Sequence, residues 1–477
     1  MSTILALVAS GAFYFASTGV GTSWPLAWVA PAPVLWLAYG PSSWPRVGIV
    51  AFLAFLIGEC NLIPVYGSVV PMAALAVGLS LPALGFAAVI LSSRYVWKRL
   101  PARLAVLVFP VFFTAWEFVF SLISPNGTAG SISHTQVAFV QFIQISRLVG
   151  WLGITFALSL VPSAIAVAVR NRTQPLWLVG ITFSVLLVCL GYGTQVLDRD
   201  QEQDTVRVGL AVTDTSVAAF RTEDQDQAMR VIHSYARRVK ELAARGAQIV
   251  VLPEKFVAIR PEWADVGRGV LASAAREGNV ILAAGFNEWL ANGRQRNVAV
   301  IFLPSGEIAG EYLKRYLVPG FESEYQQGNS LLKLPEAIGV AICKDMDFPV
   351  VGRDYSRNNV GLLLVPSWDF VKDGPMHARM AVLRGVEGGF SVARTAQEGV
   401  LTASDDHGRI LAEEKSSGAP EVLLLATLPI GTGNTLYARI GDAFGYLLVL
   451  AAVSLLIAAR RRRIQAGFAP GSTKGDL

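Results

Sequence analysis

Long apolar stretches fill the first part of the chain, and their lengths predict helices that span a membrane. Seven stretches lie at about 3–20, 24–40, 46–64, 70–92, 104–123, 149–169 and 175–194, and an eighth lies at about 439–459. Each is close to the ~20 residues that a helix needs to cross ~30 Å of hydrocarbon. The first stretch lacks a preceding basic segment and six more follow it, so we expect an uncleaved anchor rather than a signal peptide. The pattern predicts an α-helical transmembrane bundle of about eight spans.

After residue 205 the pattern changes to short apolar runs that alternate with helical spacing. Strands are predicted at 207–212, 248–252, 280–284, 299–303, 361–366, 390–395, 399–404 and 422–426, with helices at about 224–245, 270–276 and 377–387. Such alternation, with a few hairpins, indicates a layered α/β domain. The predicted organisation is a bundle of about seven helices (1–195), a linker (196–205), an α/β domain (206–432), a final transmembrane helix (439–459) and a basic tail (460–477).

Composition and loop charge add the expected orientation. A hydrophobic content of 53% is too high for an ordinary soluble protein. Basic residues follow the fourth, sixth and eighth stretches, namely Arg94, Lys98, Arg99, Arg103, Arg170, Arg172 and Arg460 to Arg463. By the positive-inside rule these lie in the cytoplasm, which places both termini there and the α/β domain outside. Because a short basic cluster beside a span is a topogenic signal, we expect no nucleic-acid partner.

Cys343 is the first candidate for chemistry. The apolar run at 337–342 ends at this cysteine, as a buried strand does when it delivers a side chain to a sheet edge. Ligands collect at the carboxyl ends of strands in α/β proteins, although a lone cysteine is more often a buried structural residue. The other two cysteines, Cys60 and Cys189, fall in apolar stretches, and the four histidines are scattered. We therefore expect no disulfide framework, no metal site and no cofactor.

Two upstream segments supply partners for a thiol. Residues 247–254 form an apolar run that ends at Glu254, and Lys314 lies within residues 312–319 (YLKRYLVP). A carboxylate can take the proton of a thiol, and an ammonium can stabilise the oxyanion that forms when the thiolate attacks a carbonyl. Each residue alone also has a structural explanation. Glu254 could be a carboxylate at a helix start, Lys314 a surface charge and Cys343 a buried apolar side chain.

Together, the three segments resemble the Glu-Lys-Cys triad of the nitrilase, or carbon-nitrogen hydrolase, superfamily, in that family's order. Residues 312–319 are most similar to its membrane-bound branch, the apolipoprotein N-acyltransferases. The resemblance covers residues 206–432 and, with the apolar stretches, nearly the whole chain. It implies an α-β-β-α sandwich in which Glu254 is the general base, Lys314 the oxyanion stabiliser and Cys343 the nucleophile.

The resemblance also implies supporting residues. Glu322 matches a second family glutamate, and Asp345 stands where the family has a glutamate after the nucleophile. Trp368 and Phe370 either line an acyl channel or pack the domain. Glu117, in a Trp-Glu pair within a span, either makes a structural hydrogen bond or lines the site, whereas Glu59 is expected at the interface. Residues 124–130 (SPNGTAG) replace the family's usual Arg and aromatic run.

The implied function is N-acyl transfer at the bacterial inner membrane, without a cofactor. The acyl donor would be a phospholipid in the bilayer, and the acceptor the N-terminal amine of a diacylglyceryl-cysteine lipoprotein. One alternative is a membrane-tethered amidase that hydrolyses a small exterior amide with the same triad. A third reading is a non-catalytic domain that binds a lipid or a partner. Residues 263–269 and 321–329 are polar connections that contain glycine, and they are candidates for loops that close the site.

Overall fold

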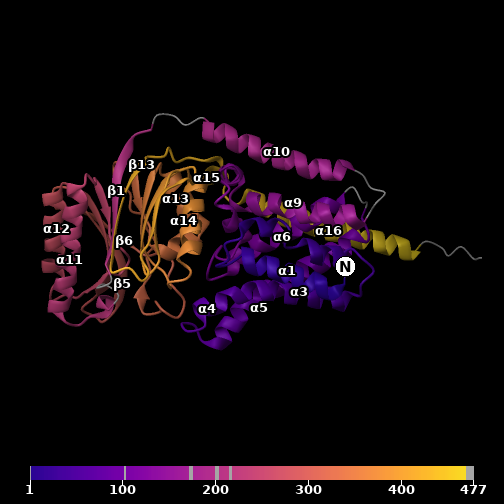
Figure 1. Cartoon of the computed structure of the whole chain (residues 1–477), viewed down its shortest axis with the longest axis horizontal. Helices are drawn as coiled ribbons and strands as arrows, with labels where there is room; N and C mark the ends of the chain where they lie inside the picture. The colour runs from indigo at the N-terminus through magenta and orange to yellow at the C-terminus, as the bar shows by residue number, and fades with distance from the viewer. Residues whose placement is uncertain (1, 101–103, 171–175, 199–202, 214–217, 469–477) are drawn as a thin grey trace, which may run out of the picture.

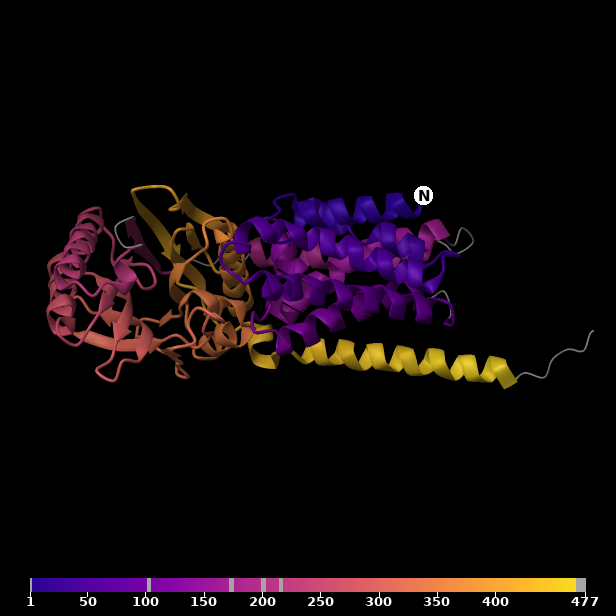
Figure 2. The same ribbon diagram turned by 90° about the horizontal axis from the view of Figure 1, so that it is seen from below.

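The structure is a computed structural model that describes residues 2–100, 104–170, 176–198, 203–213 and 218–468. Figure 1 shows two parts side by side, an α/β sandwich and a bundle of long helices. The sandwich begins at β1 and ends at β13, and the last helix returns the chain along the bundle (Figure 2). The predicted fold class, an apolar helical bundle joined to a nitrilase-like α/β domain, is confirmed.

The bundle and its connections contain most of the helices. They are α1 (Thr3–Ser17), η1 (Trp24–Trp28), α2 (Ala32–Ala38), α3 (Trp44–Glu59), η2 (Cys60–Leu62), α4 (Ile63–Tyr66), α5 (Met72–Trp97), α6 (Ala105–Ile123), η4 (Ile132–Gln136), α7 (Val140–Ile143), α8 (Ser146–Val149), α9 (Trp151–Arg170), α10 (Leu176–Asp198) and α16 (Ala443–Phe468). Of the eight predicted spans, six correspond to helices long and apolar enough to cross a membrane. These helices make the chain a membrane protein.

The first two predicted spans are shorter than expected. Thr3–Ser17 is a single apolar helix, and Trp24–Ala38 is divided into η1 and α2. Pro31 lies at the division and has no backbone N–H to continue a helical hydrogen-bond ladder. At the other end of the chain, the helix α16 begins at Ala443 and runs through the arginine cluster, so residues 460–468 continue the helix.

Two β-sheets form the middle of the sandwich. One has the order β13-β1-β2-β4-β5-β6, with β3 paired to β4 and β7 to β5, and the other has the order β12-β11-β10-β9-β8. The strands are β1 (Thr205–Thr213), β2 (Ile249–Val251), β3 (Val257–Ile259), β4 (Ile281–Trp289), β5 (Gln295–Phe302), β6 (Ile308–Leu313), β7 (Tyr325–Gln326), β8 (Ile338–Val340), β9 (Leu362–Trp368), β10 (Ser391–Gln397), β11 (Val400–Ser404), β12 (Ile410–Lys415) and β13 (Glu421–Pro429). Apolar side chains from both sheets, such as Val208 and Leu364, pack into one core.

Helices cover both outer faces of the two sheets. The helices α11 (Gln225–Ala244) and α12 (Ala264–Gly278) pack on the first sheet, farthest from the bundle (Figure 1). The helices α13 (Pro349–Arg357), α14 (Gly374–Gly388) and α15 (Leu436–Ile440) lie on the side of the bundle. Val382 and Val386 of α14 share a core cluster with Phe142 and Trp151 of the bundle. Helix α14 is therefore buried between the second sheet and the membrane part.

The prediction of a loop at residues 263–269 is wrong. Helix α12 begins at Ala264, and its buried face carries Gly267 and Leu271. A Cβ atom at Gly267 would lie 2.9 Å from Cδ1 of Ile232 on α11. Gly267 therefore permits the close approach of α11 and α12. The glycine in this segment serves helix packing and does not mark a loop.

Gly85 of α5 offers a test of the bundle packing. A Cβ atom there would lie 1.9 Å from Cζ2 of Trp116 on α6, whereas one at Gly78 of the same helix has no atom within 4 Å. Both substitutions by alanine add the same helix propensity, so their difference isolates the contact. We expect Gly85→Ala to be less stable than Gly78→Ala by about 1–3 kcal/mol in thermal unfolding in detergent. Equal stabilities would show that α5 and α6 are not in this contact.

Candidate active site

The nucleophile candidate lies on a strained turn. Cys343 follows the end of β8 by three residues and begins the 3₁₀ turn η7 (Cys343–Asp347) with a φ of +43°. A positive φ in a residue with a side chain costs of order 1–3 kcal/mol and persists only where the surroundings impose it. The Sγ atom lies 3.4 Å from the carbonyl oxygen of Trp368, at the end of the neighbouring strand β9. The strand therefore presents a thiol at the sheet edge, as its sequence pattern predicts.

Lys314 lies in a buried cluster of opposite charges. It directly follows β6, its side chain is fully buried, and its Nζ atom is 2.7 Å from Oε1 of Glu254 and 2.9 Å from Oε2 of Glu322. Nζ of Lys255 lies 2.6 Å from Oε1 of Glu322, so two ammonium groups face two carboxylates. Nδ2 of Asn297 donates hydrogen bonds to both carboxylates, at 2.6 Å and 2.8 Å. The cluster is electrically balanced and held by short hydrogen bonds.

The charges in this cluster set the protonation states. Burial opposes the charge of Lys314, but Glu254 and Glu322 raise the pKa of its ammonium well above the usual value. Burial raises the pKa of Glu322, yet Lys314 and Lys255 hold it well below the ordinary range. For the Cys343 thiol, burial and then Glu254 raise the pKa well above its usual value, against the opposing effect of Lys314. At neutral pH the resting site therefore holds an ammonium, an ionised Glu322 and a neutral thiol.

Asp345 joins the lysine segment to the nucleophile turn. Its Oδ1 atom accepts hydrogen bonds from the backbone N–H groups of Arg315 and Tyr316, at 3.1 Å and 2.8 Å. Its Oδ2 atom accepts from the N–H of Ile342 at 2.9 Å and from the hydroxyl of Tyr312 at 2.8 Å. Burial raises the pKa of Asp345 to about 6 despite these donors. The carboxyl thus fixes the residues on either side of Lys314 relative to the residue before Cys343.

The aromatic candidates lie beside the thiol and toward the bundle. The ring of Trp368 packs edge-on against Phe220 at 4.8 Å between centroids. Phe370 lies 5.4 Å from the ring of Phe321 and 6.1 Å from that of Tyr66, which comes from α4 of the bundle. Phe321 is 40% exposed. The rings of Phe370, Phe321 and Tyr66 form an apolar wall between the sandwich and the bundle.

Glu117 is not brought into the cluster around Lys314. Within the bundle its carboxylate accepts hydrogen bonds from the hydroxyls of Thr155 and Ser131, at 2.6 Å and 2.9 Å, and from the N–H of Ile132 at 3.1 Å. It also lines a cavity together with Glu59. Glu117 therefore holds the segment that follows α6, and that segment reaches the nucleophile turn.

The bundle holds the nucleophile turn through residues 124–131. Oδ1 of Asn126 accepts a hydrogen bond from Nζ of Lys344 at 2.7 Å. The N–H and the hydroxyl of Thr128 both donate to the carbonyl oxygen of Asp347, at 3.0 Å and 2.8 Å. Between them Gly127 has a φ of +53°, and a Cβ atom there would lie 2.6 Å from the same carbonyl oxygen. Residues 124–130 differ from the usual family sequence, and in the structure they connect the membrane part to the turn that carries Cys343.

Sequence reasoning missed several groups in the site. Asn297 and Lys255 complete the charge cluster. Asn297 is the last of three polar residues that begin β5 (QRN), so its sequence carried no separate signal. His377 of α14 is a further ionisable group close to η7, and it lies 3.3 Å from Asp373 and 3.7 Å from Asp347. Burial lowers the pKa of His377, but these two carboxylates raise it to about 10, so the ring is an imidazolium at neutral pH.

Comparisons with known proteins cover both the membrane part and the α/β domain of the chain. Residues 209–440 match the carbon-nitrogen hydrolase family, and residues 10–165 match the apolipoprotein N-acyltransferase N-terminal domain. The chain belongs to the carbon-nitrogen hydrolase superfamily, as a membrane-bound member. The membrane part matches as well, so the chain is an apolipoprotein N-acyltransferase-like member of this superfamily. Such members are acyltransferases.

Individual relatives cover different parts of the chain. The apolipoprotein N-acyltransferase of Geobacter metallireducens is 26% identical over 95% of this chain and 94% of its own length. The Shewanella oneidensis protein of the same name is 32% identical over 34% of this chain and 33% of its own. Omega-amidase NIT2 of Xenopus tropicalis is 28% identical over 35% of this chain and 66% of its own.

The effects of charge on the thiol can be measured by alkylation. In a Cys60→Ser, Cys189→Ser background Cys343 is the one thiol that remains, since the chain has three cysteines. We expect the pH midpoint of its reaction with iodoacetamide to lie above that of a free cysteine, about 8.5, because burial raises the pKa of the thiol. Glu254→Gln should lower the midpoint, since it removes a negative charge, and Lys314→Met should raise it. Midpoints that do not move, or move the other way, would contradict the proposed proximity of the three residues.

Proposed function

We propose that this protein transfers an acyl chain from a phospholipid to the N-terminal amine of a diacylglyceryl-cysteine lipoprotein, through a thioester on Cys343. The observation that carries the proposal is the position of the thiol, on a turn that the membrane bundle itself holds, near a buried ammonium and carboxylate. Donor and acceptor are both anchored in lipid, so a catalytic domain docked on a bundle meets them at the bilayer surface.

The first half-reaction forms the thioester. Glu254 takes the thiol proton as Sγ of Cys343 attacks the ester carbonyl of the phospholipid. The ammonium of Lys314 stabilises the oxyanion, and its removal should cost ~10²–10³ in rate. When the tetrahedral intermediate collapses, the C–O bond breaks and the proton on Glu254 passes to the departing lysophospholipid oxygen.

The second half-reaction releases the thiol. The free amine of the acceptor attacks the thioester carbonyl, and Glu254 removes a proton from the attacking nitrogen. The C–S bond then breaks, the amide is released, and the thiolate regains its proton from Glu254. Glu322, Asn297 and Lys255 hold the ammonium and the base in place, and Asp345 fixes the turn; these four are positioning residues.

The aromatic wall of Phe370, Phe321 and Tyr66 supports a lipid substrate. It places apolar, partly exposed surface between the catalytic domain and the bundle, on the side from which an acyl chain would arrive. The amidase alternative uses water in the second half-reaction and needs neither this wall nor the bundle. The similarity to omega-amidase NIT2 covers only 35% of the chain, which leaves the membrane part unexplained by that alternative.

The proposed location is the bacterial inner membrane, with the catalytic domain outside. Figure 2 shows the N-terminus and the far end of α16 at the end of the bundle remote from the sandwich. The arginines 460–463 lie toward that end of α16, and α5 and α9 end in basic residues. The positive-inside rule assigns this end to the cytoplasm.

Intact-protein mass spectrometry tests the proposal. After incubation with mixed phospholipids, wild type should carry an acyl adduct that hydroxylamine removes, and Cys343→Ala should carry none. Addition of a synthetic diacylated lipopeptide should discharge the adduct onto the peptide amine. Discharge by water alone would indicate a lipid hydrolase, and the absence of an adduct with every phospholipid would contradict the proposal and direct the search to small amides.

A further inference from the structure

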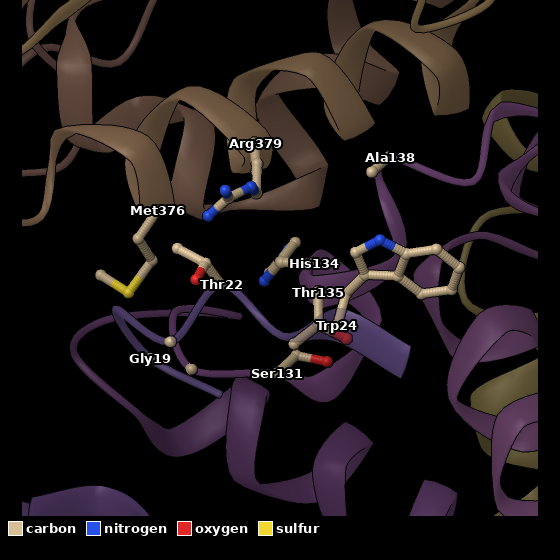
Figure 3. Close-up of a pocket in the computed structure, with 11 residues that line it drawn as sticks. Gly19, Thr22, Trp24, Ser131, His134, Thr135, Ala138, Met376 and Arg379 are labelled. Carbon is tan, nitrogen blue, oxygen red and sulfur yellow. The ribbon is translucent and has the colours of Figure 1, made fainter. Parts of the chain in front are cut away.

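A second cavity lies where helix α14 faces the bundle, and no residue of the proposed triad lines it. Its volume is about 40 Å³, which is room for a few water molecules or one small ion. The lining residues come from the connection between α1 and η1, from the segment after α6 and from α14 (Figure 3). They are Gly19, Gly21, Thr22, Trp24, Gly130, Ser131, His134, Thr135, Ala138, Met376 and Arg379.

Arg379 gives this cavity its charge. It is the one charged side chain among the lining residues of the described chain, and no carboxylate is among them. Arg379 forms no hydrogen bond or ion pair with any residue that the structure describes, although Glu413 lies close enough to act on its charge. Burial lowers the pKa of the Arg379 guanidinium more than the attraction of Glu413 raises it, so the loss of hydration is not fully offset within the protein. An anion bound in the cavity would supply the partner that Arg379 lacks, so the buried charge favours anion binding.

His134 and Thr22 supply further donors. Nε2 of His134 lies 3.2 Å from Nη2 of Arg384, and because arginine only donates, this nitrogen is the acceptor. Burial, and then the charges of Arg384 and His377, hold the pKa of His134 well below its usual value, so the ring is neutral and its one proton is on Nδ1. Thr22 is an exposed residue. Figure 3 shows the Arg379 guanidinium, the His134 imidazole and the Thr22 hydroxyl pointing toward the same space.

Two further hydroxyl groups in the cavity, those of Ser131 and Thr135, already have hydrogen-bond partners. The hydroxyl of Ser131 donates to Glu117, and that of Thr135 donates to the carbonyl oxygen of Ile132. Glycines and the side chains of Trp24, Ala138 and Met376 line the rest of the cavity. A Cβ atom at Gly130, whose φ is +88°, would have no atom within 4 Å, so the cavity is open at this residue.

The cavity lies at the level expected for lipid head groups. It follows the end of α1 nearest the sandwich, and α1 carries exposed apolar side chains such as Val8 and Phe15 along its length. Trp24 lines it, and tryptophan is enriched at the boundary between lipid and water. Arginine binds phosphate through two parallel hydrogen bonds, and phosphate is the anion that this layer provides.

We propose that this cavity is a phosphate-binding site, formed by Arg379, His134 and Thr22, for a phospholipid head group or a free phosphate ion. The site is separate from the thioester chemistry. A bound phosphate would join the connection after α1 and the segment after α6 to α14, and so would hold the catalytic domain on the bundle.

Binding to the purified full chain in detergent tests this proposal without an activity assay. The ligands are dihexanoyl-phosphatidylglycerol, inorganic phosphate, and dihexanoylglycerol as the form without phosphate; affinity and the shift in melting temperature are measured. The variants are wild type, Arg379→Gln and Lys372→Gln. Lys372 is an exposed cation seven residues earlier that does not line the cavity, so it controls for the loss of one charge.

We expect wild type and Lys372→Gln to bind a phosphate-bearing ligand equally, and Arg379→Gln to bind it roughly 10- to 100-fold more weakly. Without ligand, Arg379→Gln should melt no lower than wild type, because Arg379 has no protein partner to lose. Binding of the lipid but not of inorganic phosphate at the same concentration assigns the site to a head group, and comparable binding of both assigns it to the ion. Equal affinities in Arg379→Gln and wild type, or stronger binding of dihexanoylglycerol than of both phosphate ligands, would overturn the proposal.

Discussion

The catalytic half of the protein depends on the burial of one ammonium group. Lys314 has no exposed side-chain surface, and it is balanced by Glu254 and Glu322 within hydrogen-bond distance. A buried charge without its partners would cost several kcal/mol, so the strand ends that carry these residues cannot shift independently. Asn297, on β5, bonds both carboxylates and fixes their separation. The first sheet and the charge cluster therefore form one structure, and the same cluster contains the residues proposed as base and oxyanion stabiliser.

The thiol is attached to this cluster through backbone contacts. The carboxylate of Asp345 accepts hydrogen bonds from the backbone after Lys314 and from the backbone N–H of Ile342, just before Cys343. Asn126 and Thr128 of the bundle bond the same turn at Lys344 and Asp347. The strained backbone of Cys343 persists because these contacts impose it. The bundle therefore contributes contacts to the candidate site in addition to its apolar helices, and this would place the proposed chemistry close to the membrane surface.

The sequence allowed prediction of the fold class and of the strands before Glu254 and Cys343, because each of these residues follows a short apolar run. Lys314 was found through the resemblance of residues 312–319 to the family motif, since the strand β6 that precedes it is largely exposed and gave no strand signal. The sequence did not reveal Asn297 or Lys255, since their partners lie far away in sequence and only the folded sheet brings them together. The helix start at Ala264 was missed because glycine was taken as a loop signal when its role is helix contact. The segment 124–131 was noticed for its composition, but its contact with the turn required the structure.

The most direct test of the central claim, that Glu254, Lys314 and Cys343 act as one unit, is the single-turnover rate of thioester formation in Glu254→Gln, Lys314→Met and the double variant. Each single change should lower the rate by ~10²-fold or more, because one removes the base and the other the oxyanion stabiliser. The double variant should be about as slow as the slower single variant, since members of a catalytic unit do not contribute additively. A wild-type rate in either single variant, or losses that multiply in the double variant, would contradict the account.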